Sequence, residues 1–282
     1  MTLLQIKDHF FKELENLYPE TEIQSFFDLI VEHNFGVRRI DMALKPELYS
    51  ESWSDRPFQE ALEDLKKERP IQYIIGETEF AGMPFYVDEN VLIPRPETEE
   101  LVIWIVETAR ELQSPKILDI GTGSGCIPIA LAKNLPSAEI QALDASSKAL
   151  EIAQKNAARL NKKVKFFLHD ILSPNQLYQS YDVFVSNPPY VRQSEKGQMR
   201  GNVLRHEPDL ALFVSDLDPL QFYRSIAEHG QHSLHSGGLV FFEINENLAN
   251  DTTLLLSDMG YQDIVTKKDI YGKDRMIRAV KK

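Results

Sequence analysis

The sequence predicts an α/β protein in which a small N-terminal helical bundle precedes a largely parallel sheet with an antiparallel hairpin at its C-terminal edge. Apolar residues recur at helical spacing over roughly the first 70 residues. Strand and helix patterns then alternate from Lys116 onward, which is typical of a parallel sheet with crossover helices. The final stretch, Gly260–Lys282, has no room for another crossover helix. A length of 282 residues accommodates these two parts.

The N-terminal part consists of short helical patterns between prolines. An apolar face runs from Leu3 to Leu17 and stops at Pro19, and a second runs from Ile23 to Val31. A third covers residues 57–68, with its apolar positions on one side. Short helices with close breakers predict a bundle over residues 1–70.

Residues 71–93 change in character, because β-branched and aromatic side chains become frequent. Gly76 and the tip 81–84 suit a hairpin. We therefore expect a β-hairpin linker over 71–93, followed by a helix from Glu97 to Leu112 at the start of a second domain, 94–282.

The second domain alternates in a regular way. Its strands are predicted at 116–120, 139–143, 164–168, 181–186 and 238–244, and its helices at 125–134, 147–161, 218–235 and 247–258. The strands are continuously apolar, which indicates a sheet that is buried on both faces. Two last strands, 261–267 and 275–280, predict the edge hairpin.

A glycine-rich loop follows the first of these strands and opens a helix. Its spacing, Asp-x-Gly-x-Gly-x-Gly, matches neither the dinucleotide pattern G-x-G-x-x-G nor the phosphate-binding pattern G-x-x-x-x-G-K. The glycines allow a sharp turn and a close approach of backbone to ligand. The candidate binding residues of the loop are Gly121, Thr122, Gly123, Ser124 and Gly125.

An acidic residue, Asp144, ends the next predicted strand. A carboxylate there can accept the two hydroxyls of a ribose. A glycine loop and a ribose acid without a phosphate-binding feature point to S-adenosylmethionine. Asp119, directly before the loop, either binds the amine of the methionine part or caps the loop; the sequence leaves both open.

The tetrapeptide Asn187-Pro188-Pro189-Tyr190 follows the fourth predicted strand. Methyl transfer to a planar amide or amino nitrogen requires both N–H groups to be held by acceptors. The Asn187 side-chain carbonyl and the Pro188 main-chain carbonyl can serve, and two prolines keep the loop rigid. Tyr190 is expected to cover the flat face of the acceptor. Catalysis would then rest on orientation rather than on a strong base.

These motifs resemble the HemK/PrmC family of protein-(glutamine-N5) methyltransferases along nearly the whole chain. The resemblance includes the segments 69–76, 80–87 and 91–99, the glycine loop and the Asn-Pro-Pro-Tyr motif, and extends to 207–212 and 222–226. It implies a Rossmann-like class I methyltransferase sheet. It also implies a helical bundle for substrate-protein recognition, and methylation of the Gly-Gly-Gln glutamine in class-1 peptide chain release factors.

The same resemblance implies further site roles. Gly121–Gly125 and Asp144 would bind S-adenosylmethionine, and Asp170 and Ile171 would flank its adenine. Asn187 would contact both cofactor and substrate, with the whole of Asn187–Tyr190 holding the glutamine amide.

The formal net charge of −12 argues against a field that holds nucleic acid non-specifically, so no stable nucleic-acid partner is expected. An alternative activity, methylation of adenine N6 or cytosine N4 in nucleic acid, shares the loop and the Asn-Pro-Pro-Tyr motif. It would need a target-recognition region and a basic groove, for which the chain leaves little room. A binding module without catalysis is the other alternative.

The locally basic segment 267–282 is either a solvated hairpin or a contact for an acidic partner or RNA.

Other features favour ordinary structural roles. His229, His232 and His235 have no acidic or cysteine ligands at metal-binding spacing, so no metal is expected. The single cysteine, Cys126, is interpreted as a small buried apolar residue. The start of the chain lacks the features of a signal or transit peptide and no apolar run could span a bilayer, so we expect a cytoplasmic protein without a membrane partner.

Overall fold

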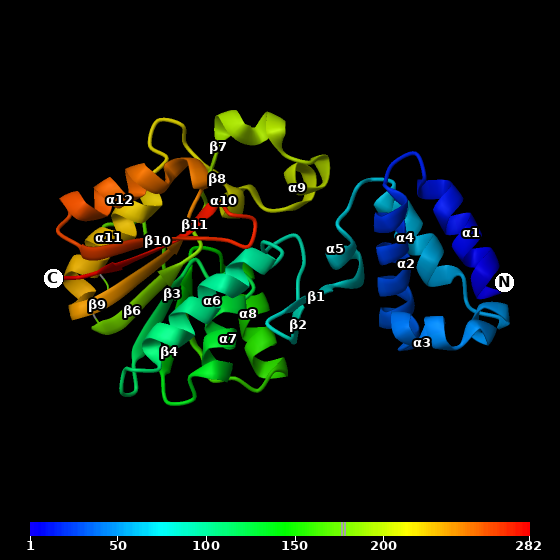
Figure 1. Cartoon of the computed structure of the whole chain (residues 1–282), viewed down its shortest axis with the longest axis horizontal. Helices are drawn as coiled ribbons and strands as arrows, with labels where there is room; N and C mark the ends of the chain where they lie inside the picture. The colour runs from blue at the N-terminus through cyan, green and yellow to red at the C-terminus, as the bar shows by residue number, and fades with distance from the viewer. Residues whose placement is uncertain (176, 178) are drawn as a thin grey trace. The chain divides into compact units, whose positions relative to one another are not determined.

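The computed structural model describes residues 1–175, 177 and 179–282, and it divides into two compact units (Figure 1). The first unit comprises Met1–Gly76 together with Arg200–His206, and the second comprises Glu77–Met199 and Glu207–Lys282. The division therefore differs from the expected ranges 1–70, 71–93 and 94–282. It falls at Gly76, and a short segment from late in the chain belongs to the helical unit.

The first unit is a helical bundle around an aromatic core. Its elements are α1 (Leu3–Leu14), α2 (Glu20–Phe35), α3 (Arg39–Leu44), the 3₁₀ helix η1 (Pro46–Ser50), α4 (Arg56–Leu65), α5 (Ile71–Ile75) and α9 (Gly201–His206). Phe27 stacks on Phe58 with ring centroids 5.1 Å apart, and Phe10 meets both rings edge-on. The predicted apolar face of the first helix is narrower than expected. Leu4, in the first turn of α1, and Leu17, beyond its end at Leu14, are each about half exposed.

The segment expected as a β-rich linker is partly helical. Residues Ile71–Ile75 form α5, which Gly76 ends in a left-handed conformation with φ of +72°. The hairpin itself is confirmed over β1 (Glu77–Phe80) and β2 (Met83–Tyr86), which pair antiparallel. A run of β-branched and aromatic residues is compatible with a single helical turn when one side of the turn is buried, as Ile71 and Tyr73 are here.

The second unit contains a seven-stranded sheet in the order β10-β11-β9-β6-β3-β4-β5. The strands are β3 (Lys116–Ile120), β4 (Glu139–Asp144), β5 (Lys165–Leu168), β6 (Tyr181–Ser186), β9 (Leu234–Glu243), β10 (Gln262–Lys268) and β11 (Asp274–Val280). Strands β5, β4, β3, β6 and β9 run parallel, while β11 is antiparallel to both β9 and β10. This confirms the predicted sheet and its C-terminal edge hairpin.

Helices cover both faces of the sheet (Figure 1). The longer ones are α6 (Pro96–Ala109), α7 (Cys126–Asn134), α8 (Ser147–Arg159), α11 (Gln221–Ser233) and α12 (Ala249–Asp258). The short elements are β7 (Val191–Arg192), η2 (Gln193–Gln198), α10 (Asp209–Leu212), β8 (Phe213–Val214) and η3 (Glu246–Leu248). The strand Val191–Arg192 pairs parallel with Phe213–Val214 in a separate two-stranded sheet that the sequence did not predict.

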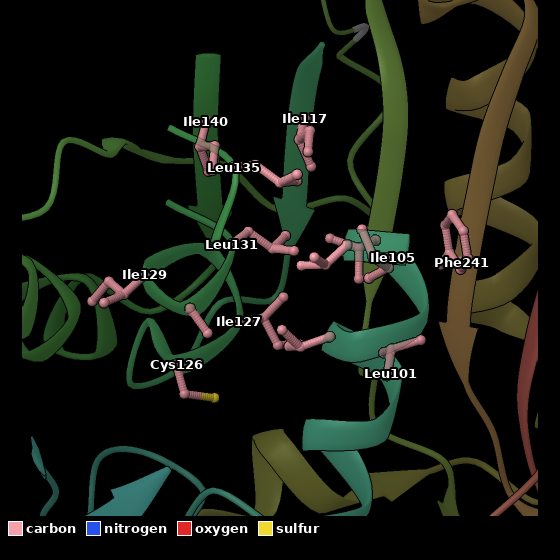
Figure 2. Packing of buried hydrophobic residues seen from close by; sticks show 14 of the residues in the cluster. Leu101, Ile105, Ile117, Cys126, Ile127, Ile129, Leu131, Leu135, Ile140 and Phe241 are labelled. Atoms are coloured by element: carbon pink, nitrogen blue, oxygen red, sulfur yellow. The ribbon is translucent and has the colours of Figure 1, made fainter. Parts of the chain in front are cut away.

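Alternate residues of the parallel strands pack into two separate hydrophobic cores, one on each face of the sheet. Ile117 and Phe241 face the core beneath α6 and α7, where they lie with Leu101 and Ile105 of α6 and Leu131 of α7 (Figure 2). Their strand neighbours, such as Leu118 and Phe242, face the opposite core beneath α11 and α12. Burial on both faces explains why these strands are apolar without alternation.

The carboxyl ends of the parallel strands point to the same edge of the sheet. In the sheet, β4 lies on one side of β3 and β6 lies on the other, so the strand order reverses at β3. In open α/β sheets, ligands bind where the strand order reverses in this way. Among the described residues, no helix is both long and apolar enough to cross a bilayer.

Candidate active site

A cavity of about 320 Å³ opens at this edge of the sheet in the second unit. It is lined by residues that follow β3, β4, β5 and β6, together with the residues before and at the start of α6. Ten of the predicted site residues line it: Gly121, Thr122, Gly123, Ser124, Asp144, Asp170, Ile171, Asn187, Pro188 and Pro189. Gly125, the last residue of the loop, does not line the cavity, although its neighbours Ser124 and Cys126 do.

The glycine loop turns back over the end of β4. Its glycines take left-handed conformations, with φ of +76° at Gly121, +53° at Gly123 and +81° at Gly125. The N–H groups of Gly121 and Thr122 both donate to the carbonyl oxygen of Leu143 at 3.0 Å. A Cβ at Gly125 would lie 3.0 Å from the Cβ of Ala153 on α8. The last glycine therefore serves helix packing as well as the turn.

Asp144 is oriented by backbone donors on both of its carboxylate oxygens. The N–H of Gly123 donates to Oδ2 and that of Ser146 donates to Oδ1, each at 2.8 Å. Burial nevertheless raises the pKa of Asp144, because these hydrogen bonds only partly offset the loss of water. Each oxygen retains a lone pair for a ribose hydroxyl.

Asp119 ends up fully buried, and neither of its carboxylate oxygens has a hydrogen-bond partner among the described residues. Burial raises its pKa to about 7, and the nearby Asp144 carboxylate raises it further. A cap accepts a backbone N–H, and no backbone N–H donates to Asp119 among the described residues, so this geometry favours the first alternative. The hydroxyls of Thr122 and Ser124 are likewise buried without partners. Unpartnered buried groups of this kind suit the cationic amine of a bound amino acid moiety.

Asn156 on α8 supports the loop from behind and was not predicted. Its side chain is fully buried, and its amide nitrogen donates to the carbonyls of Ser124 at 2.9 Å and Tyr86 at 3.0 Å. Its carbonyl oxygen accepts the Tyr86 N–H at 2.7 Å. One side chain thus joins the glycine loop to the hairpin. An asparagine in the middle of an apolar helix face was the available signal.

Asp170 and Ile171 follow β5 and line the cavity, as expected of residues beside an adenine. The Asp170 carboxylate accepts the N–H of Leu172 at 2.9 Å, which holds the turn. The Ile171 carbonyl accepts the hydroxyl of Ser225 on α11 at 2.5 Å. Ile171 itself is buried and supplies an apolar surface rather than an aromatic one.

Asn187 and Pro188 lie directly after β6, at the mouth of the cavity. The Asn187 side-chain nitrogen donates to the Thr98 hydroxyl oxygen at 3.3 Å, and the Thr98 hydroxyl donates to Glu243 at 2.7 Å. Thr98 lies in the first turn of α6, and Glu243 ends β9 with only 1% of its surface exposed. Burial raises the pKa of Glu243. Neither Thr98 nor Glu243 was among the predicted site residues.

Tyr190 does not line the cavity, in contrast to the position expected of a residue that covers the acceptor. Its hydroxyl donates instead to Glu243 at 3.0 Å, and its carbonyl accepts from the side-chain amide of Asn245 at 3.1 Å. Burial and the Glu243 carboxylate raise the pKa of the Tyr190 phenol. In this structure Tyr190 holds the loop.

An ion pair that the sequence analysis missed stands at the cavity wall. The guanidinium of Arg95 lies 2.5 Å from the carboxylate of Glu207, whose side chain is only 1% exposed. The other oxygen of Glu207 accepts the N–H of Ile93 at 3.3 Å. Arg95 and Glu207 both belong to segments that carried the resemblance, and 112 positions separate them.

The histidines and the cysteine that the sequence analysis left out of the site belong to no metal-binding group among the described residues. The described residues contain no group of three or more histidine, cysteine or acidic side chains that could hold a metal. His229 is buried beside His169, and burial lowers its pKa. Burial also raises the pKa of the Cys126 thiol to about 12, which disfavours the nucleophilic thiolate although the side chain lines the cavity.

Comparison with known proteins identifies the family of the chain. The family model of the methyltransferase small domain matches residues 100–207. The release factor glutamine methyltransferase of Flavobacterium psychrophilum is 48% identical over 281 residues, which cover 99% of each chain. The Bacteroides thetaiotaomicron protein of the same name is 44% identical and covers 95% of this chain and 96% of its own.

Solved structures show the same fold at lower similarity. The Thermus thermophilus 16S rRNA methyltransferase RsmC, in complex with AdoMet and guanosine, aligns with a TM-score of 0.52 and 17% identity. The alignment covers 73% of this chain and 50% of that one. It supports the class I methyltransferase fold, while the sequence matches are specific and almost full-length. The chain therefore belongs to the release factor glutamine methyltransferase family.

Proposed function

We propose that this enzyme transfers a methyl group from S-adenosylmethionine to the side-chain amide nitrogen, N5, of the glutamine in the Gly-Gly-Gln motif of class-1 peptide chain release factors. The relatives that share almost the whole chain carry the matching name. The observation that carries the proposal is that one cavity brings together the glycine loop, Asp144, and the Asn187–Pro188 pair. A site for the nucleoside part of the donor therefore adjoins two acceptors suited to an amide N–H₂ group.

The residues of the cavity fit S-adenosylmethionine. Asp144 would hold the ribose hydroxyls with the lone pairs left free by its backbone donors. The unpartnered Asp119 carboxylate beneath the loop suits a positive charge nearby, and Asp170 and Ile171 would flank the adenine. When bound, the cofactor supplies an electrophilic methyl group on a sulfonium. The protein supplies the cavity, the orientation and the hydrogen-bond acceptors.

The substrate amide needs acceptors rather than a base. Its two N–H bonds can be directed to the Asn187 side-chain oxygen and the Pro188 main-chain oxygen, which leaves the nitrogen facing the donor. Because the Asn187 nitrogen already donates to Thr98, its oxygen is the atom left for the substrate. Pro188 and Pro189 restrict the backbone and keep both acceptors in place. The proton that leaves after methylation can pass to water.

The direct test is mass spectrometry of a recombinant class-1 release factor after incubation with the enzyme and S-adenosylmethionine. We expect the peptide that contains the Gly-Gly-Gln motif to gain one methyl group on glutamine. An unmodified peptide would remove the substrate assignment. Methylation of bare duplex DNA at low salt instead would favour the nucleic-acid alternative.

A variant locates the reaction at the proposed acceptors. Asn187→Ala should lower turnover about a hundredfold or more while the calorimetric affinity for S-adenosylmethionine changes less, because orientation is lost and the donor site remains. Asn250→Ala, an exposed position on α12, is the matched control. Full turnover in Asn187→Ala would contradict the proposed mechanism.

A further inference from the structure

We infer that Thr98 and Glu243 are positioning residues that determine which end of the Asn187 amide faces the substrate. This inference rests on the proposed function, since the orientation matters for holding an amide N–H₂ group. It concerns two side chains that come from different parts of the chain and that do not themselves accept the substrate.

The evidence is a chain of hydrogen bonds with a defined direction. The hydroxyls of Thr98 and Tyr190 each donate to one oxygen of Glu243, so Glu243 is the acceptor in both hydrogen bonds. The Thr98 hydroxyl has a single proton, and its 2.7 Å contact with Glu243 uses it. The oxygen of Thr98 is then available to Asn187 only as an acceptor. Asn187 must therefore direct its nitrogen toward Thr98, which is the 3.3 Å contact observed, and its oxygen away.

The same carboxyl group also forms a hydrogen bond with Tyr190, at the other end of the Asn-Pro-Pro-Tyr motif. The second oxygen of Glu243 accepts the Tyr190 hydroxyl at 3.0 Å, so Tyr190 too can only donate there. Glu243 is almost completely buried, which makes each of these hydrogen bonds costly to break. Asn187 and Tyr190 flank the two prolines, and one buried group therefore holds the motif on both sides.

The orientation has a chemical consequence. An Asn187 amide turned by 180° would direct its N–H₂ group at the N–H₂ group of the substrate. Two donors would face each other, and one N–H of the substrate would lose its acceptor. The substrate nitrogen would no longer be aimed at the methyl group, and misplacement on that scale costs about tenfold to a hundredfold in rate. Thr98 and Glu243 exclude this orientation.

The test compares Thr98→Val, which keeps the side-chain shape and removes the hydroxyl, with Thr98→Ser, which restores a hydroxyl. We expect Thr98→Val to lower kcat tenfold or more, with the affinity for S-adenosylmethionine changed less than threefold. Thr98→Ser should recover kcat to within about threefold of the unaltered enzyme. Thr252→Val is the matched control, because Thr252 is also buried but its hydroxyl donates to the main-chain carbonyl of Leu248, just before its own helix.

A second readout does not depend on activity. In protein labelled with ¹⁵N at asparagine, the Asn187 side-chain signal is assigned by its disappearance in Asn187→Ala. One of its N–H protons should exchange slowly with solvent in the unaltered protein and in Thr98→Ser, and quickly in Thr98→Val.

The outcomes separate this inference from the proposed function. Unchanged kcat or unchanged proton exchange in Thr98→Val overturns the inference. Equal impairment of Thr98→Val and Thr98→Ser does so as well, because it indicates loss of packing only. If the unaltered enzyme methylates no release factor while the exchange pattern is as expected, the orientation of Asn187 stands and the assigned substrate fails.

Discussion

Replacing Asp119 by asparagine should stabilise the ligand-free protein at alkaline pH. The carboxyl group is fully buried without a hydrogen-bond partner, and burial raises its pKa from 3.8 to about 7. Between these two values the folded protein holds a proton that the unfolded chain has released. Stability therefore falls as the pH rises from about 4 to about 7, and it stays lowered above that.

The magnitude follows from the difference in pKa. About three units correspond to about 4 kcal/mol at a pH above 7, since each unit is worth about 1.4 kcal/mol. Part of this cost is already present at pH 5, so the change between pH 5 and pH 8 is about 3 kcal/mol. Asparagine has no charge to lose, and Asp119→Asn should escape this change. In thermal unfolding the gain at pH 8 amounts to about 8–16 °C for a domain of this size, at about 2–4 °C for each kcal/mol.

Urea unfolding of both proteins at pH 5 and pH 8, without S-adenosylmethionine, measures the effect. Asp258→Asn, at an exposed position of the same unit, is the control and should behave as the unaltered protein. Saturating S-adenosylmethionine should narrow the gap at pH 8, because a cation near Asp119 favours the ionised carboxylate. The same pH dependence in Asp119→Asn and in the unaltered protein would refute this reasoning.

Two further predictions concern packing around the cavity. Gly125→Ala should destabilise by about 2–4 kcal/mol in urea unfolding, because its φ of +81° is strained for alanine and the new Cβ would meet Ala153 at 3.0 Å. Gly260→Ala has a similar φ and open space, so it should lose less, and equal losses would contradict the packing argument. Arg95→Met should destabilise by about 3 kcal/mol because it leaves Glu207 buried and unpaired, and adding Glu207→Gln should recover most of the loss. Additive losses in the double variant would count against the pair.

Much of the fold was predictable because its local and tertiary requirements agree. The strands from Lys116 to Ser186 were predicted to within one residue of their observed bounds, since burial on both faces demands an uninterrupted apolar run. The hairpin of β10 and β11 was predicted from the lack of room for a crossover helix. The segment Ile71–Ile75 was misassigned because short apolar runs suit a helical turn as well as a strand.

The sequence by itself determined that the glycine loop and Asp144 lie together at one edge of the sheet, because they follow consecutive strands whose ends must meet in a parallel sheet. Only the tertiary structure decided the orientation of the residues that we propose to hold the substrate. Thr98 and Glu243 are 145 positions apart, and they meet because the sheet order places β9 beside β6, next to the start of α6. That meeting turned Tyr190 toward Glu243 and away from the cavity, and it set the direction of the Asn187 amide. Hydrogen-bond direction depends on which buried groups face each other in the folded protein, so it cannot be predicted from the spacing of residues along the chain.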